Sequence, residues 1–177
     1  NAYGHGVVFV SSAFESMVDC FGVARLEEAL KLRSNGITKP ILLLEGFFSS
    51  KDLPILAVNN IQTVVHSKEQ LEALEEAQTP NPVKVWLKID TGMHRLGFDP
   101  RTDIDRLVNR LHHQHALIPR SVFSHFVGSD SNDFDSFSDK QFALFEEGSK
   151  KLQTAFNHHI IRHMDNSAGI EHLDRKS

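Results

Sequence analysis

Opposite charges gather in residues 88–97, a short segment that carries Lys88, Asp90 and Arg95. The stretch from Val83 to Asp90, which leads into this segment, alternates between an apolar row and a mostly polar row, which is the period of a β-strand. Lys88 and Asp90 therefore lie on the polar side of the strand's end, and a glycine-bearing turn returns Arg95 to the same place. Two cations beside a carboxylate are costly to bury unless an anionic group joins them. The segment therefore predicts a site for an anionic group.

The composition is that of an ordinary globular domain. The 177 residues are 40% hydrophobic and 24% charged, with a net charge of −4 and scattered basic residues, which argues against nucleic-acid binding. The single cysteine, Cys20, excludes an intramolecular disulfide and is expected to be a small buried apolar residue. No apolar stretch approaches the ~18 residues of a membrane span. We expect a cytoplasmic protein that binds neither nucleic acid nor membranes.

Strand-like and helix-like segments alternate along the chain. Strands are expected at residues 21–24, 41–44, 61–66, 83–90, 121–126 and 160–164. Helices are expected at residues 26–33, between Ser50 and Asn59, from a capping box at 67–70, at 104–111, and from a second capping box at 138–141 to Phe156. Residues 1–6 indicate a loop that leaves a further strand upstream of Asn1.

This alternation implies a parallel sheet, and repeating units without a glycine-rich phosphate loop favour a (β/α)8 TIM-type barrel over a doubly wound sheet. Loops of about seven of the eight strands are represented, so residues 1–177 are expected to form an incomplete barrel domain. Active sites of such barrels lie at the carboxyl ends of the strands. The unusual polar residues fall there: Tyr3, His5, Arg25, Glu45, His66, Lys88, Asp90, Arg95, His125, Asp165, Asn166 and Ser167.

Several of these residues also have ordinary structural explanations. Arg25 and Glu45 suit local loop or cap contacts, and a lone histidine such as His125 is usually a hydrogen-bonded core residue. Two histidine clusters, at residues 112–115 and 158–163, lack a carboxylate or cysteine at a ligand spacing. We therefore expect no metal site.

Four ordered motifs resemble the alanine racemases: residues 1–6 (NAYGHG), 88–97 (KIDTGMHRLG), 124–126 (SHF) and 165–168 (DNSA). The resemblance implies a barrel domain that binds pyridoxal 5′-phosphate, a β-rich second domain that this chain does not contain, and a head-to-tail homodimer. It implies interconversion of L- and D-alanine, which supplies D-alanine for peptidoglycan. Two bases then act on opposite faces of the substrate.

The resemblance also implies roles for individual residues at the cofactor. Tyr3 corresponds to a tyrosine that hydrogen-bonds the cofactor phosphate, and Asn166 and Ser167 correspond to a loop that cradles the same phosphate. His125 corresponds to an imidazole packed against the pyridine ring. Leu44 aligns with an apolar cofactor contact.

Two further correspondences concern the charged segment. Arg95 matches an arginine that holds the cofactor's phenolic oxygen and helps to place the substrate carboxylate. Lys88 matches a lysine that is often carbamylated, which would turn a Lys–Arg repulsion into an attraction. The cofactor-bearing lysine is expected two residues before Asn1, and the second base is expected on the missing domain. Residues 1–177 alone are therefore predicted to be inactive.

Three alternatives stay open at this point. A broad-specificity amino-acid racemase of the same fold would carry the same barrel motifs, because substrate choice depends largely on the missing domain. A non-enzymatic barrel that binds pyridoxal phosphate suits the chain length, but the segment 88–97 argues against it. An inactive remnant is a third reading.

Overall fold

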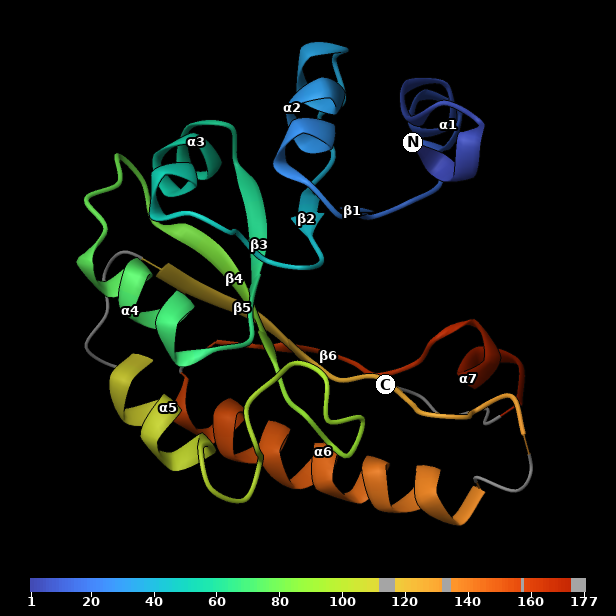
Figure 1. Cartoon of the computed structure of the whole chain (residues 1–177), viewed down its shortest axis with the longest axis vertical. Helices are drawn as coiled ribbons and strands as arrows, with labels where there is room; N and C mark the ends of the chain where they lie inside the picture. Colours follow the sequence, from blue (N-terminus) through green and yellow to red (C-terminus); the bar gives the residue numbers. More distant parts are fainter. Residues whose placement is uncertain (112–116, 132–134, 157, 173–177) are drawn as a thin grey trace. The chain divides into compact units, whose positions relative to one another are not determined.

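The computed structural model describes residues 1–111, 117–131, 135–156 and 158–172, and its helices and strands alternate along the chain (Figure 1). The strands are β1 (Phe21–Val23), β2 (Ile41–Leu43), β3 (Ile61–Val65), β4 (Val83–Lys88), β5 (Leu117–Phe123) and β6 (Ile161–His163). The α-helices are α1 (Val7–Phe14), α2 (Leu26–Ser34), α3 (Leu53–Val58), α4 (Lys68–Glu76), α5 (Ile104–Leu111), α6 (Asp135–Ala155) and α7 (Ser167–His172), and the short 3-10 turns are η1 (Ala2–Gly4) and η2 (Ser50–Asp52).

The strands are hydrogen-bonded in chain order, from β1 to β6. The pairings of β1 with β2, β2 with β3, and β5 with β6 are parallel. Parallel neighbours need a crossover connection, and helices supply it between successive strands. The prediction of an incomplete (β/α)8 barrel is therefore confirmed, and each of the six predicted strands is present with both ends within four residues of the expected bounds.

The chain is divided into two compact units. The first contains Asn1–Val64, Glu69–Val85 and a short part of β5. Its core is formed by fully buried aliphatic side chains of β2, α3, β3 and α4, such as Ile41, Leu56 and Leu74. Arg33, near the C-terminal end of α2, joins this helix to the segments that follow α2 and α3. Its guanidinium donates to four backbone carbonyls, those of Ile37, Lys39, Asn59 and Asn60.

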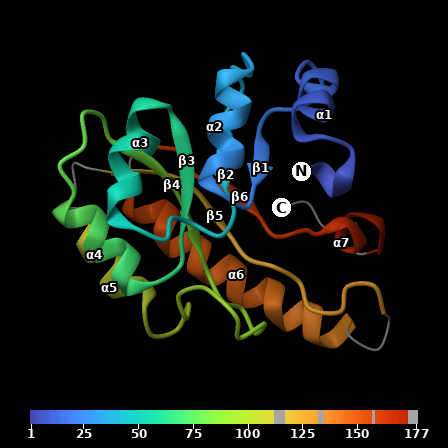
Figure 2. The same ribbon diagram turned by 45° about the horizontal axis from the view of Figure 1, so that its top comes forward.

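The second unit contains Val65–Lys68, Trp86–Gln114 and Pro119–Ser177, and α6 is its largest element. Figures 1 and 2 show the segment after β4 lying against α6. A Cβ atom at Gly148 of α6 would lie 3.1 Å from the Ile89 side chain and 3.2 Å from the Pro100 side chain, so the glycine allows a close approach that a larger residue would push apart. Phe145, Leu152 and Ile89 are buried in the core of this unit.

Two helices were not predicted from the sequence, and the predicted start of a third was wrong. Residues 7–14 form α1 and residues 167–172 form α7, although neither segment has the regular apolar spacing that identifies a helix from sequence. The capping box at 138–141 is not a helix start, because α6 begins at Asp135. Ser138 is buried inside the helix, and Gln141 uses its side chain for contacts outside it.

Within the described residues, no helix is both long and apolar enough to cross a membrane.

Candidate functional site

The segment after β4 folds back onto its own strand. Ile89 and Phe98 form a parallel bridge, in which the Asp90 N–H donates to the Phe98 carbonyl and the Phe98 N–H donates to the Lys88 carbonyl, both at 2.9 Å. Inside this closed loop, one carboxylate oxygen of Asp90 accepts the N–H groups of Gly92 and His94 at 2.9 and 3.0 Å. Asp90 therefore shapes the loop that carries Arg95, a role that the sequence analysis did not assign to it.

Gly97 permits this closure. Its φ is +129°, and a Cβ atom there would lie 2.6 Å from the Asp90 nitrogen and 2.8 Å from the Ile89 carbonyl carbon. Both of these are backbone atoms of the strand end, so they cannot turn aside as a flexible side chain would. The glycine at this position therefore sets the path of the chain from Arg95 back to β4.

Lys88 lies at the end of β4, as predicted, and it is buried, with 8% of its surface exposed. Its Nζ lies 4.7 Å from the centre of the Phe123 ring, and within the described residues no carboxylate forms an ion pair with it. Burial lowers the pKa of Lys88, the charge of Arg95 lowers it further, and Asp90 opposes the shift. The site thus holds a buried amine whose charge is disfavoured.

His125 lies on the segment that follows β5 and is half-buried. Burial lowers its pKa below the usual value, and the positive charges of Lys88 and Arg95 lower it further. The structure therefore brings together Lys88, Arg95 and His125, three of the residues that the sequence singled out. The neutral ring is the favoured form of His125 at neutral pH.

A pocket of about 450 Å³ adjoins His125 in the second unit. Such a volume suits a small-molecule ligand. Its walls are Met93, His125, Phe126, Val127, Gly128, Ser129, Asp130, Asn166, Ser167 and Ala168. His125, Asn166 and Ser167 were predicted to lie at one site, and the pocket contains all three.

Asn166 and Ser167 differ in what they offer to a ligand. The Asn166 Oδ1 accepts the Ser129 hydroxyl at 2.7 Å and the Gly169 N–H at 2.8 Å, and its Nδ2 donates to the Phe126 carbonyl at 3.3 Å. This is the pattern of a helix N-cap at the start of α7. Asn166 therefore builds the pocket wall, whereas Ser167 is exposed.

A buried polar network that the sequence did not predict connects the segments after β4 and β5. Thr91 and Ser124 share a hydrogen bond of 2.8 Å between their hydroxyl groups. The Gln141 amide donates to the Thr91 hydroxyl and to the His125 carbonyl, and its oxygen accepts the Val127 N–H. Thr91 and Ser124 lie inside two of the motifs quoted above, but Gln141 carries no sequence signal beyond its place in the supposed capping box.

The two other predicted site residues belong to the first unit. Tyr3 lies in η1 with a fully exposed side chain and a left-handed φ of 54°. Leu44 directly follows β2, as predicted, and its side chain is 49% exposed and lies beside Gly22. Both residues therefore have exposed side chains, one aromatic and one aliphatic.

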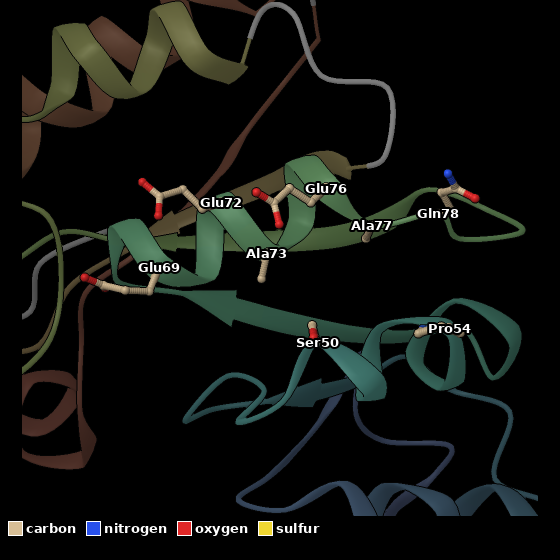
Figure 3. A pocket seen from close by; sticks show the side chains of 8 residues that line it. All are labelled: Ser50, Pro54, Glu69, Glu72, Ala73, Glu76, Ala77 and Gln78. Atoms are coloured by element: carbon tan, nitrogen blue, oxygen red, sulfur yellow. The ribbon is translucent and has the colours of Figure 1, made fainter.

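A larger hollow of about 500 Å³ lies in the first unit, between α4 and the segment of η2 and α3 (Figure 3). Glu69, Glu72 and Glu76 follow one another along α4 on its rim. Their carboxylates would repel an anionic ligand. None of the residues predicted to act at a site lines it, so we regard it as a solvated acidic helix face.

Among the residues that the structure describes, no three histidine, cysteine or acidic side chains come together as metal ligands. In the second cluster, the His158 ring contacts the Pro119 carbonyl at 2.7 Å. The cluster at residues 112–115 lies outside the described residues.

Comparison with known proteins gives a consistent result. The family model for the alanine racemase N-terminal domain matches residues 1–176. Alanine racemases of Pasteurella multocida and Haemophilus influenzae are 65% and 64% identical over 136 residues, which is 76% of this chain and 38% of each relative. The solved alanine racemase of Clostridium difficile 630 superposes with a TM-score of 0.85 at 32% identity, over 96% of this chain and 44% of that one. The chain thus spans well under half the length of these relatives.

The closure at Gly97 leads to a stability prediction. In the full-length protein, Gly97→Ala should cost more stability than Gly36→Ala, because both residues have positive φ but a Cβ at Gly36 would meet no atom within 4 Å. We expect about 1 kcal/mol for Gly36→Ala from backbone strain, and about 2 kcal/mol more for Gly97→Ala from the backbone clash. Thermal unfolding of both variants measures the difference, and equal losses would contradict the proposed clash.

The lowered pKa of His125 predicts a pH effect on stability. Below its ordinary pKa of about 6.5 the unfolded chain binds a proton that the native protein resists, so this residue makes stability fall as the pH falls. We expect His125→Gln to reduce the loss of melting temperature between about pH 7 and about pH 5. An unchanged pH dependence in the variant would show that His125 is not the group responsible.

Proposed function

Because the chain belongs to the alanine racemase N-terminal domain family, we propose that the full-length protein is an alanine racemase that depends on pyridoxal 5′-phosphate. It interconverts L- and D-alanine in the cytoplasm and supplies D-alanine for peptidoglycan. The observation that carries the proposal is the buried amine of Lys88 and the half-buried ring of His125, whose pKa values are lowered by burial and by the charge of Arg95, next to the pocket that His125 and Ser167 line. A site with this excess of positive charge favours an anionic ligand.

The donor set of the pocket fits this cofactor. Ser167 offers an exposed hydroxyl at the start of α7, and Asn166 fixes the backbone there by capping the helix. We assign these two residues to the phosphate, together with Tyr3 of the first unit. The neutral His125 ring suits packing against a pyridine ring, and Leu44 supplies an apolar contact. When bound, pyridoxal phosphate provides an electron sink for the α-proton of an amino acid.

Arg95 is the residue that we assign to the ligand's charged oxygens. Its guanidinium presents several N–H donors in a rigid fork, which matches carboxylate geometry. The loop that carries it is closed by the pairing of Ile89 with Phe98 and braced by Asp90, so the arginine starts from a fixed backbone. We propose that Arg95 holds the phenolic oxygen and helps to place the substrate carboxylate.

Lys88 supports Arg95 once it is carbamylated. The lowered pKa increases the share of neutral amine, which can attack carbon dioxide. A nitrogen–carbon bond forms, an electron pair moves onto oxygen, and one N–H proton leaves to solvent. The product is an anion beside Arg95, so a repulsion becomes an attraction.

The remaining parts of the enzyme are proposals about the full-length protein. We propose that it continues into a β-rich second domain and forms a head-to-tail homodimer. A lysine upstream of Asn1 then carries the cofactor and serves as one base, and a tyrosine of the partner's second domain serves as the other. Residues 1–177 form the barrel part that holds and orients the cofactor.

The function is tested by following the optical rotation of L-alanine with the full-length protein and pyridoxal phosphate. We expect racemisation, and we expect Arg95→Ala to lower turnover by about 100-fold or more while the cofactor absorbance is retained. Arg101→Ala is the matched control, because Arg101 is an exposed arginine that lies six residues after Arg95 and pairs with Asp99. A protein that binds the cofactor without racemising alanine or another amino acid would favour the non-enzymatic barrel.

Carbamylation of Lys88 is tested by nuclear magnetic resonance with isotope-labelled bicarbonate. We expect a carbamate signal that requires bicarbonate and is absent from Lys88→Arg, because a guanidinium stays protonated and does not attack carbon dioxide. Lys84→Arg is the control from the same strand, where Lys84 contacts the Asn60 side chain at 3.1 Å. A signal that survives in Lys88→Arg would place the modification elsewhere.

A further inference from the structure

We propose that Gln141 is a positioning residue for the cofactor site, which holds the backbone on either side of Phe126 and thereby sets the place of His125. Gln141 bonds to the backbone carbonyl of His125, whereas the part of His125 that we assign to the cofactor is its ring. The inference rests on the proposed function, because His125 and the pocket wall must face a ligand for their position to matter.

The geometry is that of an amide clamp. The Gln141 Nε2 donates to the His125 carbonyl at 3.1 Å, and its Oε1 accepts the Val127 N–H at 3.0 Å. The same Nε2 donates to the Thr91 hydroxyl at 3.3 Å. Gln141 is fully buried, so water does not compete for these atoms. One side chain of α6 thus joins the segment after β5 to the segment after β4.

The chemistry of the position calls for an amide. The backbone presents a carbonyl at His125 and an N–H at Val127, so a side chain there must offer both a donor and an acceptor. A glutamate carboxylate can accept the Val127 N–H but has no proton to donate to the His125 carbonyl. An apolar side chain would leave both backbone groups buried and unpaired, at the cost of a lost hydrogen bond for each.

The clamped segments are those that form the site. His125, Phe126 and Val127 line the pocket, and Thr91 belongs to the loop that carries Arg95. Thr91 also bonds to Ser124, the residue before His125. Release of Gln141 would therefore free both segments, and a small displacement of positioning groups is enough to reduce ligand affinity and turnover.

Gln153 provides a matched control on the same helix. Its Nε2 donates to the His158 carbonyl at 2.9 Å, and its Oε1 accepts the Ile160 N–H at 2.9 Å. This is a second amide clamp on backbone, but it holds the connection that leads into β6, and neither His158 nor Ile160 lines the pocket. A general loss of stability would be common to both glutamines, whereas a loss of site geometry would be specific to Gln141.

The experiment compares the full-length wild type with Gln141→Leu, Gln141→Glu and Gln153→Leu. Apoprotein is titrated with pyridoxal phosphate, and melting temperature and alanine racemisation are measured in parallel. We expect Gln141→Leu to weaken cofactor binding by about tenfold or more, with a fall in kcat. Gln153→Leu should lower the melting temperature while cofactor affinity and kcat stay within about twofold of wild type.

Gln141→Glu keeps the test valid if the leucine variant does not fold. Burial raises the pKa of a carboxyl group, and its protonation restores a donor to the His125 carbonyl. The cofactor affinity of this variant, relative to wild type at each pH, should therefore recover as the pH falls from about 8 to about 6. A merely structural role would shift the melting temperature without this relative recovery.

The outcomes separate the inference from the function on which it rests. Wild type that neither takes up pyridoxal phosphate nor racemises alanine overturns the proposed function. A functional wild type with equal cofactor affinities in the Gln141 and Gln153 variants overturns the positioning role alone. A specific loss at Gln141 with recovery of Gln141→Glu at lower pH supports it.

Discussion

The pairing of Ile89 with Phe98 is the constraint on which the charged site depends. Two backbone hydrogen bonds close the chain after β4 into a loop whose ends are fixed to the strand. Gly97 makes the close approach of the returning chain to the strand end sterically possible. The Asp90 carboxylate accepts hydrogen bonds from N–H groups of the same loop. As a result, Asp90 is held within its own loop, and the charge of Arg95 acts on Lys88 from the same loop.

This arrangement leaves positive charge in excess at the end of β4. Lys88 is buried against Phe123, and the pKa values of Lys88 and His125 are both lowered by burial and by neighbouring cations. Such a site is unfavourable by itself and becomes favourable when an anion enters or when the lysine becomes one. The acidic rim of α4 has the opposite character, which explains why the larger hollow is the poorer candidate for a phosphate ligand.

Helix α6 meets the segments of the site through polar contacts as well as through packing. Its apolar face is buried by residues such as Phe145 and Leu152, and Gly148 lets it approach the loop after β4. Gln141 then satisfies backbone groups of the segment that follows β5 and has left the sheet. Irregular backbone near a site must find such partners when it is buried.

The sequence by itself determined the six strands, the barrel class and the identity of the charged segment, because alternation and motif spacing are local properties. It also placed His125, Asn166 and Ser167 at one site, since the carboxyl ends of parallel strands meet at one edge. Only the tertiary structure decided that Asp90 serves its own loop, that Asn166 caps α7, and that Gln141 reaches the backbone beside His125. These roles depend on which distant backbone groups lie within hydrogen-bonding reach, and helix or strand periodicity carries no record of those distances.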